Sequence, residues 1–492
     1  MKAVIAVASW LFAATATATN GVVQWDISKR HILNKLVRRA GATLEEVIKN
    51  EQTRGGYFAT VKVGTPSQEL TLQLDTGSSD VWVPSKSANV CAKRTSPTSS
   101  NSDGCNFGTF NAANSSTFAV VGQDAFSIAY VDGSRSSGDY FTDVFEIAGA
   151  KLNNLTMGLG RKTDIPYGLI GVGYALNEAI VAGTRSASSA YPNLPVEMVN
   201  EGLIKTNAYS LWLNDLDSSS GNVLFGGIDT AKYKGNLTRI NIYKDPQTNA
   251  FTSFQVALTS VTAESTSGND VLSSQQFPMP VVLDSGTTLS YLPIDLARQI
   301  WREAGAVYSP DIGMAVLPCR MANSKGHFTF QFAGPGGPKI SVGMDELVLS
   351  INGGPAPSFS SGPYRGEDAC SFGIQNFSSD PFLLGDTFLR SAYVVYDLVN
   401  NEIGIAPTDF NATASNIVAF ESLGATIPLA TTAPNQAQVT DTPASLTTPG
   451  FAAASGFSEG TGGRKNGAPL TRALDWSQGV LVGTLILFSL LF

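Results

Sequence analysis

The sequence predicts a mainly β protein built from two similar β-lobes. From Gly56 to about Pro407, short apolar runs such as YFATVKVG, ELTLQLD and AYVVYDL alternate with clusters of Gly, Pro, Asn and Ser, the pattern of strands joined by turns. Helical signals are few. The best predict helices over 195–202, where a Pro suits the first turn and a Gly the end, and over 293–304.

The overall composition is that of a globular protein with a large core. The chain has 492 residues, of which 43% are apolar and 15% are charged, and this length suggests two or more domains. Its formal net charge of −8 argues against a nucleic-acid partner, because binding to phosphates requires clustered Lys and Arg. No nucleic-acid partner is therefore expected, and the chain is expected to be a monomer.

The N-terminal region predicts export. Lys2, an apolar run over 3–14 and small residues after it are typical of a secretory signal, expected over 1–19. The alternative, a membrane span, needs about 20 apolar residues and the run is shorter. The basic stretch over 20–53 contains the dibasic pairs Lys29-Arg30 and Arg38-Arg39, which resemble sites cut by secretory convertases. We interpret it as a propeptide; the alternative is a solvated helix face.

The C-terminal region predicts a surface anchor. Residues 411–466 are rich in Ala, Thr, Ser and Pro and poor in charged and aromatic residues, which indicates a flexible stalk. Residues 467–492 end in an uncharged apolar run, and small residues at Asn466 and beyond lie a polar spacer upstream of it. This pattern favours a glycosylphosphatidylinositol (GPI) signal with attachment at Asn466 over a transmembrane anchor. The expected location is the outer face of the plasma membrane or the cell wall, reached through the secretory pathway.

Cysteines and sequons agree with export. Four cysteines suit two local disulfides in a secreted protein, and their order suggests Cys91–Cys105 and Cys319–Cys370. Five Asn-x-Ser/Thr sequons become plausible N-glycosylation sites if the chain enters the secretory route: Asn114, Asn154, Asn236, Asn376 and Asn411.

An internal repeat divides the β-rich region into lobes at 54–235 and 236–410. Two segments, LQLDTGSS and VLDSGTT, each run from an apolar strand into Asp, a hydroxyl residue, Gly and another hydroxyl residue. They place Asp75 and Asp284 209 residues apart, about one domain and a linker. Each also has a distant companion, GLIG over 168–171 and FLLG over 382–385. The chain therefore resembles two copies of one β-lobe, each delivering one carboxylate on a tight Gly turn.

Two carboxylates that meet across a lobe interface can perform acid–base chemistry. Like charges about 3 Å apart cannot both ionise, so the pair holds one proton between its members. One carboxyl can then act as a general base while the other acts as a general acid. A zinc site or a Ser-His-Asp triad is not supported, because the two histidines, His31 and His327, have neither metal-ligand nor catalytic-triad spacing. The chemistry requires no metal and no cofactor.

These motifs resemble those of the pepsin family of aspartic proteases, and the anchor signal is similar to that of the fungal yapsin-type members. The resemblance spans about 56–407 and implies a bilobal fold with an active-site cleft between the lobes, aspartic endopeptidase activity, and protein or peptide substrates. It implies a catalytic pair at Asp75 and Asp284 and flap or substrate-binding roles for Trp82, Tyr130 and Gly133. Supporting roles at the active-site loops are implied for Thr76, Gly77, Ser78, Ser285, Gly286 and Thr287.

One flap residue suggests a specificity. Asp132 follows Tyr130 by two positions, and a carboxylate facing the pocket for the residue before the scissile bond would favour Lys or Arg there. Equally, Asp132 could only stabilise the flap turn, which Asp does well before Gly. The alternative to a protease is a catalytically silent wall glycoprotein with the same fold, or a surface adhesin; intact copies of both motifs argue against either.

Overall fold

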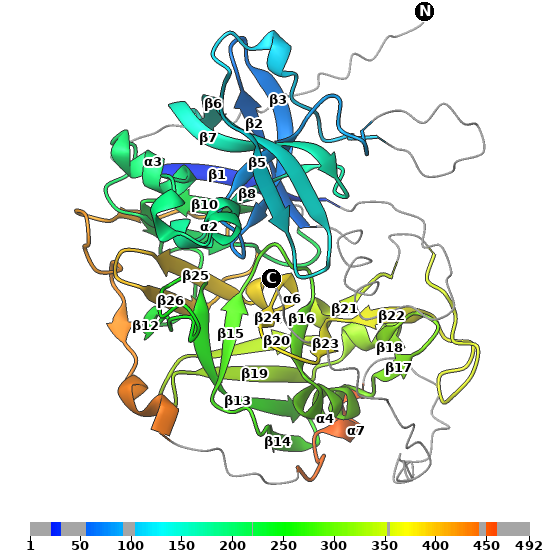
Figure 1. Cartoon of the computed structure of the whole chain (residues 1–492). Helices are drawn as coiled ribbons and strands as arrows, with labels where there is room; N and C mark the ends of the chain where they lie inside the picture. Colours follow the sequence, from blue (N-terminus) through cyan, green and yellow to red (C-terminus); the bar gives the residue numbers. More distant parts are fainter. Residues whose placement is uncertain are drawn as a thin grey trace, which may run out of the picture.

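The computed structural model describes residues 21–30, 56–91, 104–218, 220–351, 355–441 and 449–459. They form two β-rich lobes, the first coloured from blue through cyan to green and the second from green to yellow (Figure 1). The strands of the first half are β1 (Val23–Arg30), β2 (Gly56–Val63), β3 (Gln68–Asp75), β4 (Val81–Pro84), β5 (Ala119–Ala129), β6 (Arg135–Ile147), β7 (Ala150–Thr163), β8 (Gly168–Gly171), β9 (Ala208–Trp212), β10 (Ser220–Phe225) and β11 (Gly227–Asp229).

The second half contributes strands of similar length. They are β12 (Thr238–Asn241), β13 (Gln255–Ser265), β14 (Gly268–Leu272), β15 (Met279–Leu283), β16 (Ser290–Pro293), β17 (Val307–Ser309), β18 (Met314–Pro318), β19 (His327–Phe332), β20 (Lys339–Gly343), β21 (Val348–Leu349), β22 (Ala369–Phe372), β23 (Ile374–Phe377), β24 (Phe382–Leu384), β25 (Ala392–Asp397), β26 (Glu402–Pro407), β27 (Ile417–Ala419) and β28 (Thr431–Thr432). The predicted mainly β class is confirmed.

A 14-stranded sheet joins the two lobes. Its order is β28-β12-β26-β25-β9-β10-β1-β2-β3-β8-β4-β7-β6-β5, so strands from both halves of the chain lie in one sheet. The halves meet where β9 pairs with β25, with Leu211 opposite Val394. An 8-stranded sheet built around β13, β15 and β24 completes the second lobe. Because the shared sheet crosses between the lobes, the two halves of the cleft are fixed relative to each other.

The repeat found in the sequence is also a structural repeat. The strand that ends at Asp75, β3, pairs in parallel with its companion β8, and β15 pairs in parallel with β24 before Asp284. In each lobe the companion strand then pairs in an antiparallel sense with the next strand, β4 or β16. The same local topology therefore delivers both carboxyls to the lobe interface.

The helices are short and lie outside the sheets. They are α2 (Ala179–Thr184), α3 (Leu194–Asn200), α4 (Ile294–Ala304), α5 (Met344–Leu347), α6 (Asp386–Leu389) and α7 (Ala454–Phe457). The two predicted helices are confirmed as α3 and α4, within two residues at each end. Leu296, Ile300 and Trp301 form the buried face of α4, the spacing expected for a helix that packs on a sheet.

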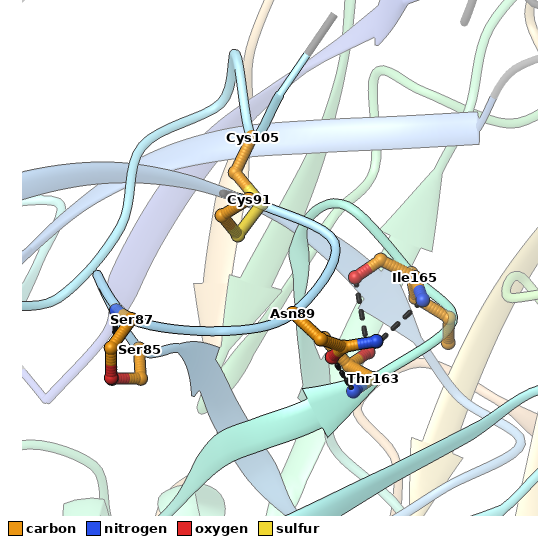
Figure 2. The surroundings of a disulfide bond; sticks show 7 residues. All are labelled: Ser85, Ser87, Asn89, Cys91, Cys105, Thr163 and Ile165. Atoms are coloured by element: carbon orange, nitrogen blue, oxygen red, sulfur yellow. Dashed lines mark hydrogen bonds between the residues drawn. A yellow bond between two sulfur atoms is a disulfide. The ribbon is translucent and has the colours of Figure 1, made fainter. Parts of the chain in front are cut away.

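Both predicted disulfides are confirmed. Cys91 and Cys105 are joined, as are Cys319 and Cys370, each pair with its Cα atoms 4.9 Å apart. Figure 2 shows the Cys91–Cys105 bond beside Asn89, whose Oδ1 accepts the Thr163 N–H at 2.7 Å. This contact fixes one end of the disulfide loop to the end of β7.

Part of the expected propeptide is a strand of the folded body. β1 lies between β10 and β2, with Trp25 opposite Val223 and Lys29 opposite Tyr57. Its side chains alternate, and Val23, Trp25 and Ile27 are buried. The apolar alternation within this basic segment explains the pairing. The rest of the segment, 31–53, lies outside the described residues.

The expectation of a flexible stalk from residue 411 is wrong for the described part of that region. β27 pairs with β11, and Phe420 and Ile427 are buried against Trp212 and Tyr393 on the shared sheet. Further along, Phe457 of α7 is buried, 5.1 Å from the Phe328 ring. In Figure 1 the orange segment passes beside β12, with which β28 pairs, and the red helix α7 lies beside α4. A few large apolar side chains that reach distant partners offset the low average hydrophobicity of this region.

Several expectations fall outside the described residues. These are the signal peptide over 1–19, the attachment residue Asn466 and the anchor signal over 467–492. Within the residues that are described, no helix is long and apolar enough to cross a membrane.

Candidate active site

The two predicted carboxyls lie at the lobe interface in matching environments. Asp75 accepts the Gly77 N–H at Oδ1, 2.8 Å away, and the Ser78 hydroxyl at Oδ2. Asp284 accepts the Gly286 N–H at Oδ1, also at 2.8 Å. The hydroxyl of Thr287 donates to its Oδ2 at 2.6 Å. The supporting residues named from the sequence are therefore those that hold the two carboxyls.

The active-site loops are braced against each other by a reciprocal pair of hydroxyl residues. The Thr76 hydroxyl donates to the Leu283 carbonyl at 2.8 Å and accepts the Ser285 N–H at 2.9 Å. Conversely, the Ser285 hydroxyl donates to the Leu74 carbonyl at 3.3 Å and accepts the Thr76 N–H at 3.2 Å. Thr76 and Ser285 are both essentially inaccessible to solvent. These four bonds fix the separation of the two carboxyls.

The turn glycines allow the carboxyls to approach. A Cβ added to Gly77 would lie 2.6 Å from Oδ1 of Asp284, and one added to Gly286 would clash with Oδ1 of Asp75. No side chain larger than hydrogen fits either position, since such contacts are closer than real Cβ atoms make. Each glycine thus brings one loop against the carboxyl of the other lobe.

Burial and proximity change the titration of Asp75. Asp75 is 4% exposed and Asp284 is 8% exposed. Burial, together with the charge of Asp284, raises the pKa of the Asp75 carboxyl, although the Ser78 and Gly77 hydrogen bonds oppose the rise. A raised pKa in a coupled pair means that the two carboxyls share a proton over a wide acidic range.

The predicted flap is the turn between β5 and β6. Tyr130 lies at its base, where its hydroxyl accepts the indole N–H of Trp82 at 2.8 Å. Burial and the nearby Asp75 charge raise the pKa of Tyr130, so the phenol stays neutral. The turn closes through hydrogen bonds from the Gly133 N–H to the Tyr130 carbonyl and from the Tyr130 N–H to the Ser134 carbonyl, both 2.9 Å.

Asp132 has a structural role in this turn. Its Oδ1 accepts the Ser134 N–H at 2.9 Å and the Ser134 hydroxyl at 2.6 Å. Asp132 is 4% exposed, yet it also lines the cleft. The turn-stabilising interpretation made from the sequence therefore has its contacts in the structure, whereas the preference for Lys or Arg stays a prediction.

A cleft of about 700 Å³ surrounds the two carboxyls. Both lobes line it, and its acidic lining residues are Asp75, Asp132, Asp245, Asp284 and Asp380. No Lys, Arg or His lines it within the described part of the chain. A cleft of this size and one-sided charge suits an extended peptide with neutral or basic side chains.

Sequence reasoning missed several residues of the cleft. Gln73 donates from Nε2 to the Gly286 carbonyl at 3.2 Å, which adds a further contact between the lobes. Asn177 donates from Nδ2 to the Gly77 carbonyl at 3.2 Å. Gln73 lies two residues before Asp75 in the same strand, so the two side chains share a face, and this spacing could have indicated a role for Gln73 at the site. Asn177 has no comparable signal in the sequence.

The remaining expected residues lie away from the carboxyl pair. Asn114, Asn154, Asn236 and Asn411 are exposed, while Asn376 is half-buried on β23. Among the described residues no group of three or more His, Cys, Asp or Glu is arranged to hold a metal ion.

With the geometry defined, comparison with known proteins gives the family. A sequence model described as "Eukaryotic aspartyl protease" matches residues 56–408. The chain belongs to this pepsin-like family, and it is an aspartic-type endopeptidase by class.

Individual relatives extend the comparison over most of the chain. "Probable aspartic-type endopeptidase OPSB" of Arthroderma benhamiae is 42% identical over 407 residues, 82% of this chain and 79% of its own length. The OPSB protein of Arthroderma otae is 41% identical and covers 87% of each chain. "Aspartic proteinase yapsin-3" of Saccharomyces cerevisiae is 32% identical over 82% of this chain and 74% of its own. The resemblance identified from the motifs is confirmed.

Proposed function

We propose that Asp75 and Asp284 hydrolyse peptide bonds by general acid–base activation of a water molecule. The observation that carries this proposal is the mirrored arrangement of the two buried carboxyls. Each accepts one glycine N–H and one hydroxyl, and each faces the glycine turn of the other lobe. Neither lobe alone contains this arrangement.

The reaction follows from one shared proton. The ionised carboxyl takes a proton from water as the water oxygen bonds to the peptide carbonyl carbon, and the protonated carboxyl donates its proton to the carbonyl oxygen. In the resulting diol one hydroxyl gives its proton to the carboxylate that had protonated the carbonyl oxygen. The carboxyl that had taken a proton from water gives it to the amide nitrogen, and the C–N bond breaks. The hydroxyls of Ser78 and Thr287 orient the two carboxyls.

Cleavage of a mixed peptide library at mildly acidic pH, with and without pepstatin, tests this function. We expect pepstatin-sensitive cleavage that is lost in Asp75→Asn. Asp139→Asn is a matched control, because Asp139 is also fully buried but pairs with Arg161 outside the cleft lining. Absence of cleavage by folded, processed wild-type protein would favour the silent binding glycoprotein instead.

We infer a preference for Lys or Arg before the scissile bond. The acidic lining of the cleft supports this, since Asp132 lies in the flap and the described lining has no cation. A buried acid is stabilised by a basic guest. Replacing Asp132 by Ser should lower the ratio of cleavage after basic residues to cleavage after aromatic residues. An unchanged ratio would leave Asp132 with its turn contact to Ser134 alone.

The same enzyme is proposed to be exported as a zymogen and held at the cell surface by a GPI anchor. Two formed disulfides suit an oxidising compartment, and four of the five sequons lie exposed on the folded body. Treating intact cells with a phosphatidylinositol-specific phospholipase C should release the active enzyme. Retention on cells would refute the lipid anchor or indicate transfer to the wall, which a wall-digesting glucanase would then release.

A further inference from the structure

Two buried acids outside the catalytic pair lie behind one wall of the cleft. Asp80 directly precedes β4 and Glu178 directly precedes α2, and both side chains are inaccessible to solvent. The groups that act on them are tyrosine hydroxyls, backbone N–H groups and, on Glu178, Asp80 itself; no Lys or Arg is among them. Burying an acid without a cation costs free energy, so the burial of Asp80 and Glu178 must have a structural role other than an ion pair.

The carboxyl of Asp80 joins three segments that are far apart in the sequence. Its Oδ1 accepts the hydroxyls of Tyr140 at 2.9 Å and Tyr191 at 2.8 Å. Its Oδ2 accepts the N–H of Ala179 at 2.8 Å. Tyr140 belongs to the flap strand β6, Tyr191 lies in the loop before α3, and Ala179 is the first residue of α2. The three elements are thereby held to the loop that carries the catalytic Asp75.

Glu178 completes this cluster without adding a charge. Its Oε2 accepts the N–H of Tyr191 at 2.9 Å. Burial, with a further contribution from Asp80, raises the pKa of Glu178 to about 9. Glu178 is therefore neutral throughout the acidic and neutral range and adds no charge beside Asp80.

The helix held in this way is a wall of the cleft. Ala179, Ala182 and Gly183 line the cleft, and Ala182 and Gly183 are exposed to it. A Cβ added to Gly183 would meet no atom within 4 Å, so α2 leaves room for a substrate side chain. α2 also packs against the flap strand β5. Its position therefore determines the shape of both the wall and the flap side of the cleft.

We propose that Asp80 is a positioning residue that fixes α2 as a substrate-binding wall and links it to the flap and the Asp75 loop. The proposal rests on the proteolytic function above. Asp80 contacts neither substrate nor the reacting atoms; it acts through the Ala179 N–H and the two tyrosines. Its loss should weaken binding of peptides long enough to reach α2 while the chemistry at Asp75 and Asp284 continues.

Steady-state kinetics on a nested series of peptides, extended one residue at a time from the shortest that is cleaved, tests this role. In Asp80→Asn only one of the two side-chain positions carries an acceptor oxygen, so either the Ala179 N–H or the pair of tyrosine hydroxyls loses its acceptor. We expect KM to rise about tenfold for the longest peptide, the equivalent of roughly one lost buried hydrogen bond. The value of kcat, and KM for the shortest peptide, should stay within about twofold.

Control variants separate positioning from general damage. Asp139→Asn removes another buried carboxyl, which is bonded to Arg161 and not to α2, and Glu178→Gln keeps a neutral side chain of the same shape; both should retain the wild-type dependence on peptide length. If Asp80→Asn does not fold, Tyr191→Phe removes one hydroxyl and should raise KM for the longest peptide about threefold.

An unchanged KM, or an equal loss of kcat for all peptide lengths, would overturn the proposal. Lack of cleavage by the wild type would instead refute the proteolytic function.

Discussion

The packing of Phe420 makes the region once expected to be a stalk part of the folded enzyme, and this can be tested with one substitution. Phe420 follows β27 and is fully buried in a cluster with Trp212 and Tyr393 on the shared sheet. Lys232 holds the chain leading into β27, since its Nζ donates to the carbonyls of Ala412 at 2.7 Å and Ala414 at 2.9 Å. Phe420→Ala would open a cavity where the segment crosses the sheet.

The expected loss is large relative to the stability of the protein. Replacing a buried Phe by Ala costs about 3–5 kcal/mol, as the lost transfer free energy and the cavity add. Total free energies of unfolding are roughly 5–15 kcal/mol. For a chain of this size the change corresponds to a fall in Tm of roughly 3–5 °C.

The assay is thermal unfolding of the purified protein, with residual activity as a second measure. Leu423→Ala is the matched control, because Leu423 lies three residues further along the same segment and is 66% exposed. It should change the free energy of unfolding by no more than about 0.5 kcal/mol. Equal Tm values for Phe420→Ala, Leu423→Ala and the wild type would refute the argument that this segment stabilises the enzyme.

Two further predictions concern the active-site loops and pH. Ser285→Ala leaves the Thr76 N–H buried without its acceptor, at a cost of about 1–3 kcal/mol, and should lower kcat about tenfold with little change in KM, measured by steady-state kinetics. Burial raises the pKa of Glu178 to about 9 and of Glu303 to about 8, so both are protonated in the native state where the unfolded chain would be ionised. The contribution of these two groups to the free energy of unfolding should thus be full below pH 4.5, the ordinary value, and fall as pH rises toward 8–9. Glu303→Gln should reduce this slope in thermal unfolding measured across pH, and an identical slope would contradict the assignment.

The sequence was sufficient for the catalytic pair because its signal is local and duplicated. Asp75 and Asp284 each follow an apolar strand, and the parallel companion strands repeat the pattern. The short helix α4 was predictable for a similar reason, since its boundary signals and buried face lie within one segment. Features encoded within a few neighbouring residues could therefore be predicted.

Features that depend on distant partners could not. Asp80 is bonded by Tyr140 and Tyr191, which lie 60 and 111 residues away, so nothing near Asp80 reveals why an acid is buried there. Phe420 and Phe457 lie in a region whose average composition indicates disorder. Their packing partners, on the shared sheet and at Phe328, lie far away in the sequence. Composition averages over a window, whereas burial depends on single contacts made across the fold.

The N-terminal strand places a further constraint on maturation. The dibasic pair Lys29-Arg30 lies in β1, opposite Tyr57 and Gly56 of β2, and the Lys29 ammonium donates to the Leu216 carbonyl at 2.8 Å. Burial and the charge of Arg390 lower the pKa of Lys29 to about 8.

A processing protease must bind its substrate as a free extended chain, which a strand held in a sheet does not offer. Cleavage at the second pair, Arg38-Arg39, outside the described residues, is therefore expected. Arg39→Ala should block this cleavage, whereas Arg30→Ala, at an exposed side chain, should leave it unchanged. The mass of the mature N-terminus distinguishes the two sites, and a chain beginning at His31 would show that β1 opens before processing.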